Sequence, residues 1–541
     1  MSAYAGVIDL TGPAPAPVAL LERLAEEVHS VCQQPIDVLQ VAALLETAGI
    51  TDHSAMMRYG HGSVFDLATS VMRCMAAPAA GRSAVLHLAP PESRRQAALD
   101  YLRGPLTLLP MVLLSVVIAV YQTVGHWTSA QVLAFSLSVV GSLLVTSGFV
   151  QAASRKGSSY LSQGYIVAAR RIVAIIVAAG LVTVAVAAAA LALAALHWLA
   201  TPLDTVATMS ISFLVLSCLW LAAGVLFLLG QVVWFGIGLA VGVALIVGAL
   251  RALELLIGQY PWIMLAATLL GFGGALSVMA LATRRELARR SAASPVSGHR
   301  VVLPPTPHLL VDLAPYFVYG LLYVLLVLSG HIAGWLGAVP AGVDRMSAVT
   351  AVEVGLTIAL GGVILAGGAA ERTVARFWRL VKIFQLRTTP AQPAEFCRLM
   401  QAFYRREAVR YAGILALCSA LMTGALLALL AWANRYDMAI LPWSPETQMI
   451  LALGVLGYGI MALGVFQCMF MITLSRPGMA GQAIVIGIAV TLLVGIAAGR
   501  SMGYPYSALG IVFGALAFTL AARQNLHRIM RYTDYYYYAS F

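Results

Sequence analysis

Twelve long runs of apolar residues follow one another along this chain, separated by short polar stretches. The predicted spans are residues 104–124, 130–153, 172–198, 207–229, 232–250, 260–283, 308–335, 350–371, 410–433, 447–473, 479–498 and 504–523. Each approaches or exceeds the ~20 apolar residues that a helix needs to cross a bilayer. The pattern therefore predicts an all-α polytopic membrane protein with about twelve transmembrane helices.

Residues 1–100 have a different pattern, because they hold ten of the chain's 22 acidic residues and form no run of spanning length. Short helices are expected from Leu21 to Val31, from Ile36 to Thr47, from Asp52 to Gly60 and from Ser63 to Met75. Asp52 and Ser63 are the expected N-caps of the last two. These residues predict a small helical cytosolic domain that docks a partner or adds stability. Its acidity argues against nucleic acid as a partner.

Basic residues alternate between the two sides of the predicted spans. The even-numbered loops and the two flanks carry 25 Lys and Arg residues, while the odd-numbered loops carry only four. Cations beside a span resist translocation, so the rich side is expected to be cytoplasmic. The net charge of +11 follows from this bias. We therefore expect a multi-pass protein of the bacterial inner membrane with both termini in the cytoplasm.

The predicted spans divide into two similar halves of six. Pro110 and Pro315 each lie early in the first span of a half, and the longest internal cytoplasmic loop of each half follows its second span. An even number of spans per half makes the repeat parallel, so two parallel six-helix bundles are expected. The predicted parts are a domain and linker at 1–100, bundles at 101–283 and 308–523, a basic linker at 284–307 and a Tyr-rich tail at 524–541.

The loop 372–409 combines an apolar face with a basic one. Phe377, Val381 and Phe384 share one helical face, while Arg372 and Arg376 lie on another. Basic amphipathic helices lie in the headgroup plane and favour anionic lipid, so anionic lipid is the expected partner of this loop. Docking of a partner protein is the alternative.

The motifs of common enzyme classes do not occur in the sequence. Neither lysine follows a glycine loop of the kind that binds ATP phosphates, and HExxH and GxSxG motifs are missing. The six cysteines form no pair or cluster with metal-ligand spacing. We therefore expect a channel or transporter rather than an enzyme, with no cofactor and no ATP hydrolysis of its own.

A few polar residues within the spans are the candidates for a transport path, because charge there is costly and usually functional. The candidates are Asp312, Tyr316, Tyr319, Tyr323, Glu353 and Glu371. Asp312 is either a helix N-terminal acid or a cavity-facing proton or substrate site. Glu353 is either an interfacial residue or part of the transport path. Glu371 lies at the inner end of its span. The three tyrosines share one helical face, which serves either ordinary packing or stacking against sugar rings.

Two six-span halves, a linker between them, and extended loops after spans two and eight resemble the multidrug/oligosaccharidyl-lipid/polysaccharide (MOP) flippase superfamily. The segment from Asp312 to Tyr323 (DLAPYFVYGLLY) and the run from Phe396 to Tyr411 (FCRLMQAFYRREAVRY) look like exporters of the Pel exopolysaccharide type. The resemblance covers about residues 100–541. It implies two bundles around a cleft, alternating access, and export of an exopolysaccharide or lipid-linked glycan. It also implies a cytoplasmic glycosyltransferase partner within a membrane synthesis complex.

Three other functions fit parts of the same pattern. A cation-coupled multidrug exporter of this fold usually relies on acids inside a bundle, and spans one to three contain none. A major-facilitator carrier has a Gly-x-x-x-Asp-Arg-x-Gly-Arg loop after span two, whereas residues 154–166 read SRKGSSYLSQGYI. A membrane scaffold that recruits a polysaccharide synthase and moves nothing is the third.

Overall fold

The computed structural model describes residues 17–31, 35, 37–76, 129–162, 165–198, 201–257, 261–293, 306–341, 343–387, 393–435 and 443–538. Within these ranges eleven helices are long and apolar enough to cross a membrane. They match the predicted spans two to twelve. The predicted first span, 104–124, and Pro110 lie outside the described residues. By its internal contacts the chain divides into two compact units, residues 1–93 with 378–396 and residues 94–377 with 397–541.

The N-terminal residues form four short helices, α1 (Pro17–Val31), α2 (Val38–Thr47), α3 (Asp52–Tyr59) and α4 (Val64–Ala76). Their inward faces build one core that includes Val41, Leu45, Leu67 and Val71, all at or near zero exposure. The expected small helical domain is therefore confirmed. One cap differs from the prediction: Thr51 caps α3 in a capping box with Ser54, while Asp52 accepts the backbone N–H of Val64.

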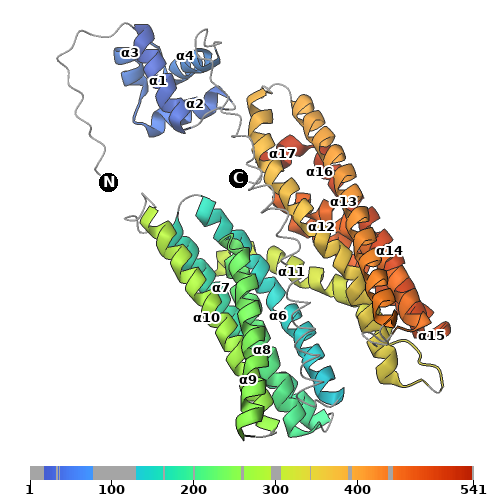
Figure 1. Cartoon of the computed structure of the whole chain (residues 1–541). Coiled ribbons are helices and arrows are strands. Elements are labelled where there is room, and N and C mark those ends of the chain that lie inside the picture. Colours follow the sequence, from blue (N-terminus) through green and yellow to red (C-terminus); the bar gives the residue numbers. More distant parts are fainter. Residues whose placement is uncertain are drawn as a thin grey trace. The chain divides into compact units, whose positions relative to one another are not determined.

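The membrane helices follow in two sets. The first set comprises α6 (Ser129–Ser162), α7 (Ile166–Trp198), α8 (Leu203–Leu228), α9 (Val232–Ile257) and α10 (Pro261–Ala293). The second comprises α11 (Thr306–Trp335), α12 (Arg345–Arg387), α13 (Pro393–Arg435), α14 (Pro445–Thr473), α15 (Pro477–Ser501), η1 (Tyr504–Ser507) and α16 (Ala508–Arg531), followed by the short α17 (Thr533–Tyr538). Helix α11 packs against both α6 and α15, so it joins the two bundles (Figure 1).

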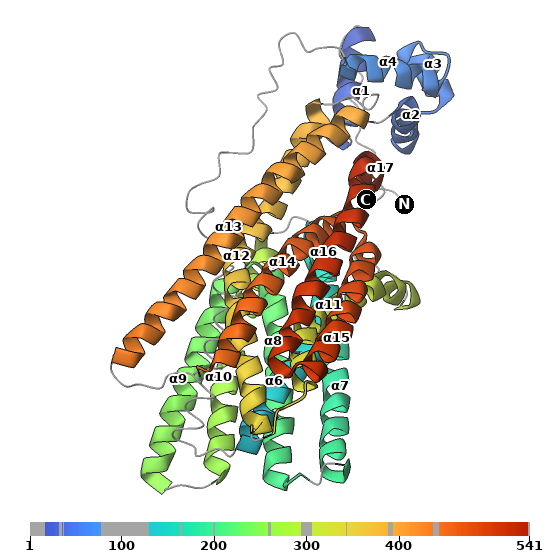
Figure 2. The same ribbon diagram turned by 90° about the vertical axis from the view of Figure 1, so that its right-hand side faces the viewer.

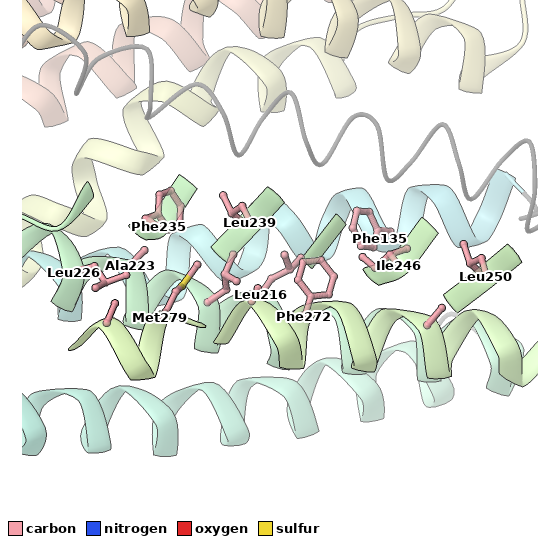
Figure 3. Packing of buried hydrophobic residues seen from close by; sticks show 14 of the residues in the cluster. Phe135, Leu216, Ala223, Leu226, Phe235, Leu239, Ile246, Leu250, Phe272 and Met279 are labelled. Atoms are coloured by element: carbon pink, nitrogen blue, oxygen red, sulfur yellow. The ribbon is translucent and has the colours of Figure 1, made fainter. Parts of the chain in front are cut away.

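Each bundle has its own apolar core. In the first bundle, Phe135, Leu216, Ile246 and Phe272 point toward one another between α6, α8, α9 and α10 (Figure 3). In the second, Phe470 and Phe518 are fully buried large side chains. Lipid tails are as apolar as these side chains, so moving the side chains from lipid into a bundle gives no hydrophobic gain. Close van der Waals packing therefore holds these helices together.

The predicted loop 372–409 is not a separate pair of surface helices. Helix α12 continues through its membrane span to Arg387, and α13 begins at Pro393 and continues into the next span (Figure 2). Phe377, placed by the pattern on a lipid-facing surface, is 1% exposed and packs against Phe403 and Phe470. The expected lipid-facing position of Phe377 is wrong, because the same apolar periodicity also suits a helix that packs against its neighbours. Anionic lipid as a partner of this loop stays a prediction.

Candidate functional site

The first bundle and the second bundle meet at the end of α6 and the beginning of α11. Lys156, near the end of α6, places its Nζ 3.0 Å from Oδ2 of Asp312, about two turns into α11. The Lys156 side chain is 25% exposed and the Asp312 side chain 57%. The sequence candidate Asp312 therefore forms an ion pair between the bundles.

Arg155, the preceding residue, makes two further contacts with the second bundle. Its guanidinium lies 5.3 Å from the centroid of the Tyr316 ring and donates a hydrogen bond to Oγ of Ser475. Ser475 lies in the turn between α14 and α15, where its φ of 57° places it in the left-handed region. We refer to Arg155, Lys156, Asp312, Tyr316 and Ser475 as the latch.

Beyond the latch, α6 and α11 approach closely because small residues face the partner helix. A Cβ added at Gly148 would lie 2.6 Å from the Phe317 ring, and one at Gly320 would lie 2.7 Å from the carbonyl oxygen of Ser147. The Phe149 and Phe317 rings meet edge to face at 4.9 Å. The latch thus sits at one end of a narrow, apolar seam between the bundles.

Two of the candidate tyrosines lie inside the second bundle. Tyr319 is 5% exposed and its ring stacks with that of Tyr323 at 6.3 Å. Tyr319 also borders an apolar cavity of about 690 Å³ between α11 and α15, whose lining includes Gln482. The three tyrosines do share one helical face. Tyr316 belongs to the latch, whereas Tyr319 and Tyr323 lie inside the second bundle.

The two candidate glutamates are not among the five latch residues. Glu353 on α12 accepts hydrogen bonds from Nδ1 of His331 at 3.0 Å and from Nε1 of Trp335 at 2.8 Å. Glu371 lies on an exposed part of α12. In the described residues no three His, Cys, Asp or Glu side chains gather into a possible metal site.

Sequence reasoning missed Arg155, Lys156 and Ser475 as site residues. The two cations counted only toward the charge of a cytoplasmic loop, although a pair of cations about two turns before a helix end is also suited to bind an acid on a neighbouring helix. Nothing in the sequence marked Ser475 as a site residue, because serine is common in turns.

Comparisons with known proteins bear on the fold of the chain. No family model matches the chain, and no curated protein matches it. The solved structure of a mutant of the MATE transporter VcmN from Vibrio cholerae superposes with a TM-score of 0.58 at 16% identity, covering 82% of this chain and 97% of that one.

The bent form of VcmN gives a TM-score of 0.56 at 15% identity, over 82% of this chain and 98% of that one. A MATE protein in complex with MaD3S gives 0.54 at 13% identity, over 81% and 96%. The chain has the fold of the MATE transporters. The expected all-α fold with two helical bundles is therefore confirmed.

Proposed function

We propose that this chain is a membrane transporter that exports an exopolysaccharide or a lipid-linked glycan by alternating access between its two bundles. The MATE fold supports transport, because it builds two separately packed bundles, which in the described part of the chain meet along the seam between α6 and α11. The chain carries no phosphate-binding loop, so energy for the movement comes from a gradient or from the cargo.

The observation that carries the proposal is the latch. It closes one end of the seam through a partly exposed ion pair, one cation–π contact and one hydrogen bond. An exposed ion pair contributes only about 0–1 kcal/mol, and an exposed cation–π contact about 0.5–1 kcal/mol. Contacts of this size hold the closed state and still allow it to open. The same cations place the latch at the predicted cytoplasmic end.

The glycan cargo is favoured by the chemistry around α11. Tyr316 at the latch presents an aromatic ring of the kind that packs against sugar C–H faces. Arg155 and Lys156 suit the phosphate of a lipid carrier, and the apolar cavity beside Pro315 and Val318 suits its hydrocarbon chain. A glycosyltransferase on the cytoplasmic side would supply the polymer to this end.

A disulfide across the seam tests alternating access. The Cβ position at Gly148 lies 2.9 Å from Cγ of Phe317, so the two Cβ atoms lie at most ~4.4 Å apart and do not exceed the upper limit of the about 3.5–4.5 Å that a disulfide needs. Gly148→Cys/Phe317→Cys, made without the native cysteines, should stop polymer secretion when oxidised and regain it under a reductant.

The matched control is a disulfide inside the first bundle. The Cβ position at Gly224 on α8 lies 3.3 Å from Cβ of Val150 on α6, so Val150→Cys/Gly224→Cys should form a bond and leave secretion unchanged. Secretion that continues while the Gly148/Phe317 pair is fully oxidised would show that the bundles need not separate along this seam. A scaffold would give that result.

A small-molecule exporter is the second candidate, because the superposed structures are MATE transporters. It predicts that deleting the chain raises sensitivity to toxic cationic compounds and leaves polymer secretion intact. The glycan exporter predicts the reverse. Measuring both in one deletion strain separates the two functions.

A further inference from the structure

The turn between α14 and α15 carries a latch residue directly beside a residue that contacts the C-terminal helix α17. Ser475 accepts a hydrogen bond from Arg155 of the first bundle. The next residue, Arg476, places its guanidinium 5.0 Å from the centroid of the Tyr536 ring on α17. Consecutive Cα atoms lie only about 3.8 Å apart, so a shift of one of these residues also moves the other. The turn therefore connects α17 to the latch.

Ser475 occupies a backbone position that usually belongs to glycine. The turn is a Schellman motif, in which the N–H of Ser475 donates to the carbonyl of Ile472 at 2.9 Å and the N–H of Arg476 donates to that of Met471 at 2.8 Å. Glycine is the common residue at its left-handed position, but here a serine adopts a φ of 57°. Glycine would lack the hydroxyl that Arg155 binds, so the contact with the first bundle accounts for the strained position.

Helix α17 is fixed at its base, so it can hold this turn in place. It follows directly after α16 (Figure 2). The hydroxyl of Thr533, a residue with no exposed surface, donates to the carbonyl of Met530 at 3.0 Å. The side-chain amide of Gln401 on α13 donates to the same carbonyl at 2.9 Å. The ring of Tyr536 is thus presented to Arg476 from a base that is tied to two membrane helices.

We propose that α17 regulates the latch: Tyr536 holds Arg476, and with it the turn, where Ser475 can accept the hydrogen bond from Arg155. Arg476 and Tyr536 are positioning residues, because they act on the latch through Ser475. The regulatory role rests on the proposed transport function, since latch opening matters only if the bundles separate. Displacement of α17 weakens the contact of Ser475 and leaves the ion pair of Lys156 and Asp312 in place, so it opens the latch only in part.

Latch opening is measured with a thiol reporter in the seam, on the full-length protein in nanodiscs. Ala152 of α6 is 3% exposed and packs in the cluster that includes Leu309 and Leu313 of α11. Ala152→Cys, in an otherwise cysteine-free protein, reacts with a thiol reagent when the seam opens. Ala223→Cys, in the core of the first bundle, is the control reporter, because it responds to general loosening of the fold.

Tyr536→Ala should raise the labelling rate at position 152 about two- to fivefold, the change that an exposed cation–π contact produces, and leave position 223 unchanged. Tyr536→Phe keeps the ring and should label like the native protein. Tyr532→Ala is the matched control, because it removes an exposed tyrosine whose ring lies 5.9 Å from the Arg531 guanidinium. An unchanged rate in Tyr536→Ala, or an equal acceleration in Tyr532→Ala, overturns the proposal.

Ser475→Gly tests whether α17 acts through the turn. Glycine adopts the left-handed conformation without strain, so this variant keeps the turn and removes the acceptor of the Arg155 hydrogen bond. It should accelerate labelling at least as much as Tyr536→Ala does. Combining the two substitutions should give no further acceleration. Additive effects would mean that α17 reaches the seam by another route, and the proposal would be wrong.

The proposed function and the role of α17 fail separately. If the seam disulfide leaves secretion intact while the Tyr536 and Ser475 variants label as described, the transport function is wrong and the link between α17 and the latch stands. If the oxidised disulfide stops secretion while Tyr536→Ala labels like the native protein, the transport function stands and α17 does not regulate the latch.

Discussion

Removing the charge of Asp312 should loosen the latch by an amount that the structure bounds. At 3.0 Å, two unit charges in a water-like medium attract by about 1.4 kcal/mol. Ordering two flexible side chains offsets part of this, and measured exposed pairs retain about 0.2–1 kcal/mol. Because Lys156 is three-quarters buried, we expect the upper half of that range, about 0.5–1 kcal/mol, which is a two- to fivefold change in the open population.

A double-mutant cycle isolates this energy. Asp312→Asn, Lys156→Gln and their combination are each made with the Ala152→Cys reporter, and thiol labelling rates are compared. When closing is faster than labelling, the rate follows the open population. Each single variant should label two- to fivefold faster, and the double variant should label no faster than the quicker single one.

Two results would refute this reasoning. Additive effects in the double variant would mean that Lys156 and Asp312 do not interact in the closed state. Equal acceleration by Arg289→Gln, which removes a cation paired with Glu286 inside the first bundle, would mean that labelling responds to general surface charge instead of the latch.

Two further predictions address orientation and the N-terminal domain. Lys156→Cys and Arg345→Cys are made singly in a cysteine-free background and exposed to an impermeant thiol reagent added outside intact cells. Only the cysteine at position 345 should react. Equal reaction at both positions would contradict the expected topology. Deleting residues 1–90 should leave the membrane bundles inserted and folded but weaken recruitment of a cytoplasmic partner, because the core of α1–α4 is made from their own residues. Gel filtration and pull-down measure these two effects, and aggregation of the truncated protein would contradict them.

Much of the fold was predictable because a bilayer imposes simple rules on sequence. Every spanning backbone group needs an internal partner, so long apolar runs must be helical. The runs of spans two to twelve, the four N-terminal helices and the pairing of halves follow from that rule and from local capping. The N-cap at Thr51 differed, because Thr51 and Asp52 are both good capping residues, and so did loop 372–409, whose residues continue the helices α12 and α13.

The candidate site was less accessible to sequence reasoning. Asp312 and Tyr316 stood out as polar groups in an apolar span, and Glu353 did so for the same reason. Which residue each one contacts depends on helix rotation and on contacts between positions far apart in the sequence: Lys156 and Asp312 are separated by 156 residues, and Arg155 and Ser475 by 320. One sequence carries no record of such distances.

The sequence by itself determined the positions of the membrane helices that correspond to spans two to twelve, the charge asymmetry of the loops and the presence of a separate helical domain, because each depends on local composition. Only the tertiary structure decided that α12 and α13 extend beyond the membrane spans as packed helices. It also decided that Tyr316 contacts Arg155 while Tyr319 stacks with Tyr323, and that His331 contacts Glu353. These outcomes depend on which faces of neighbouring helices pack together, and side-chain packing between helices is a property of the assembled bundle.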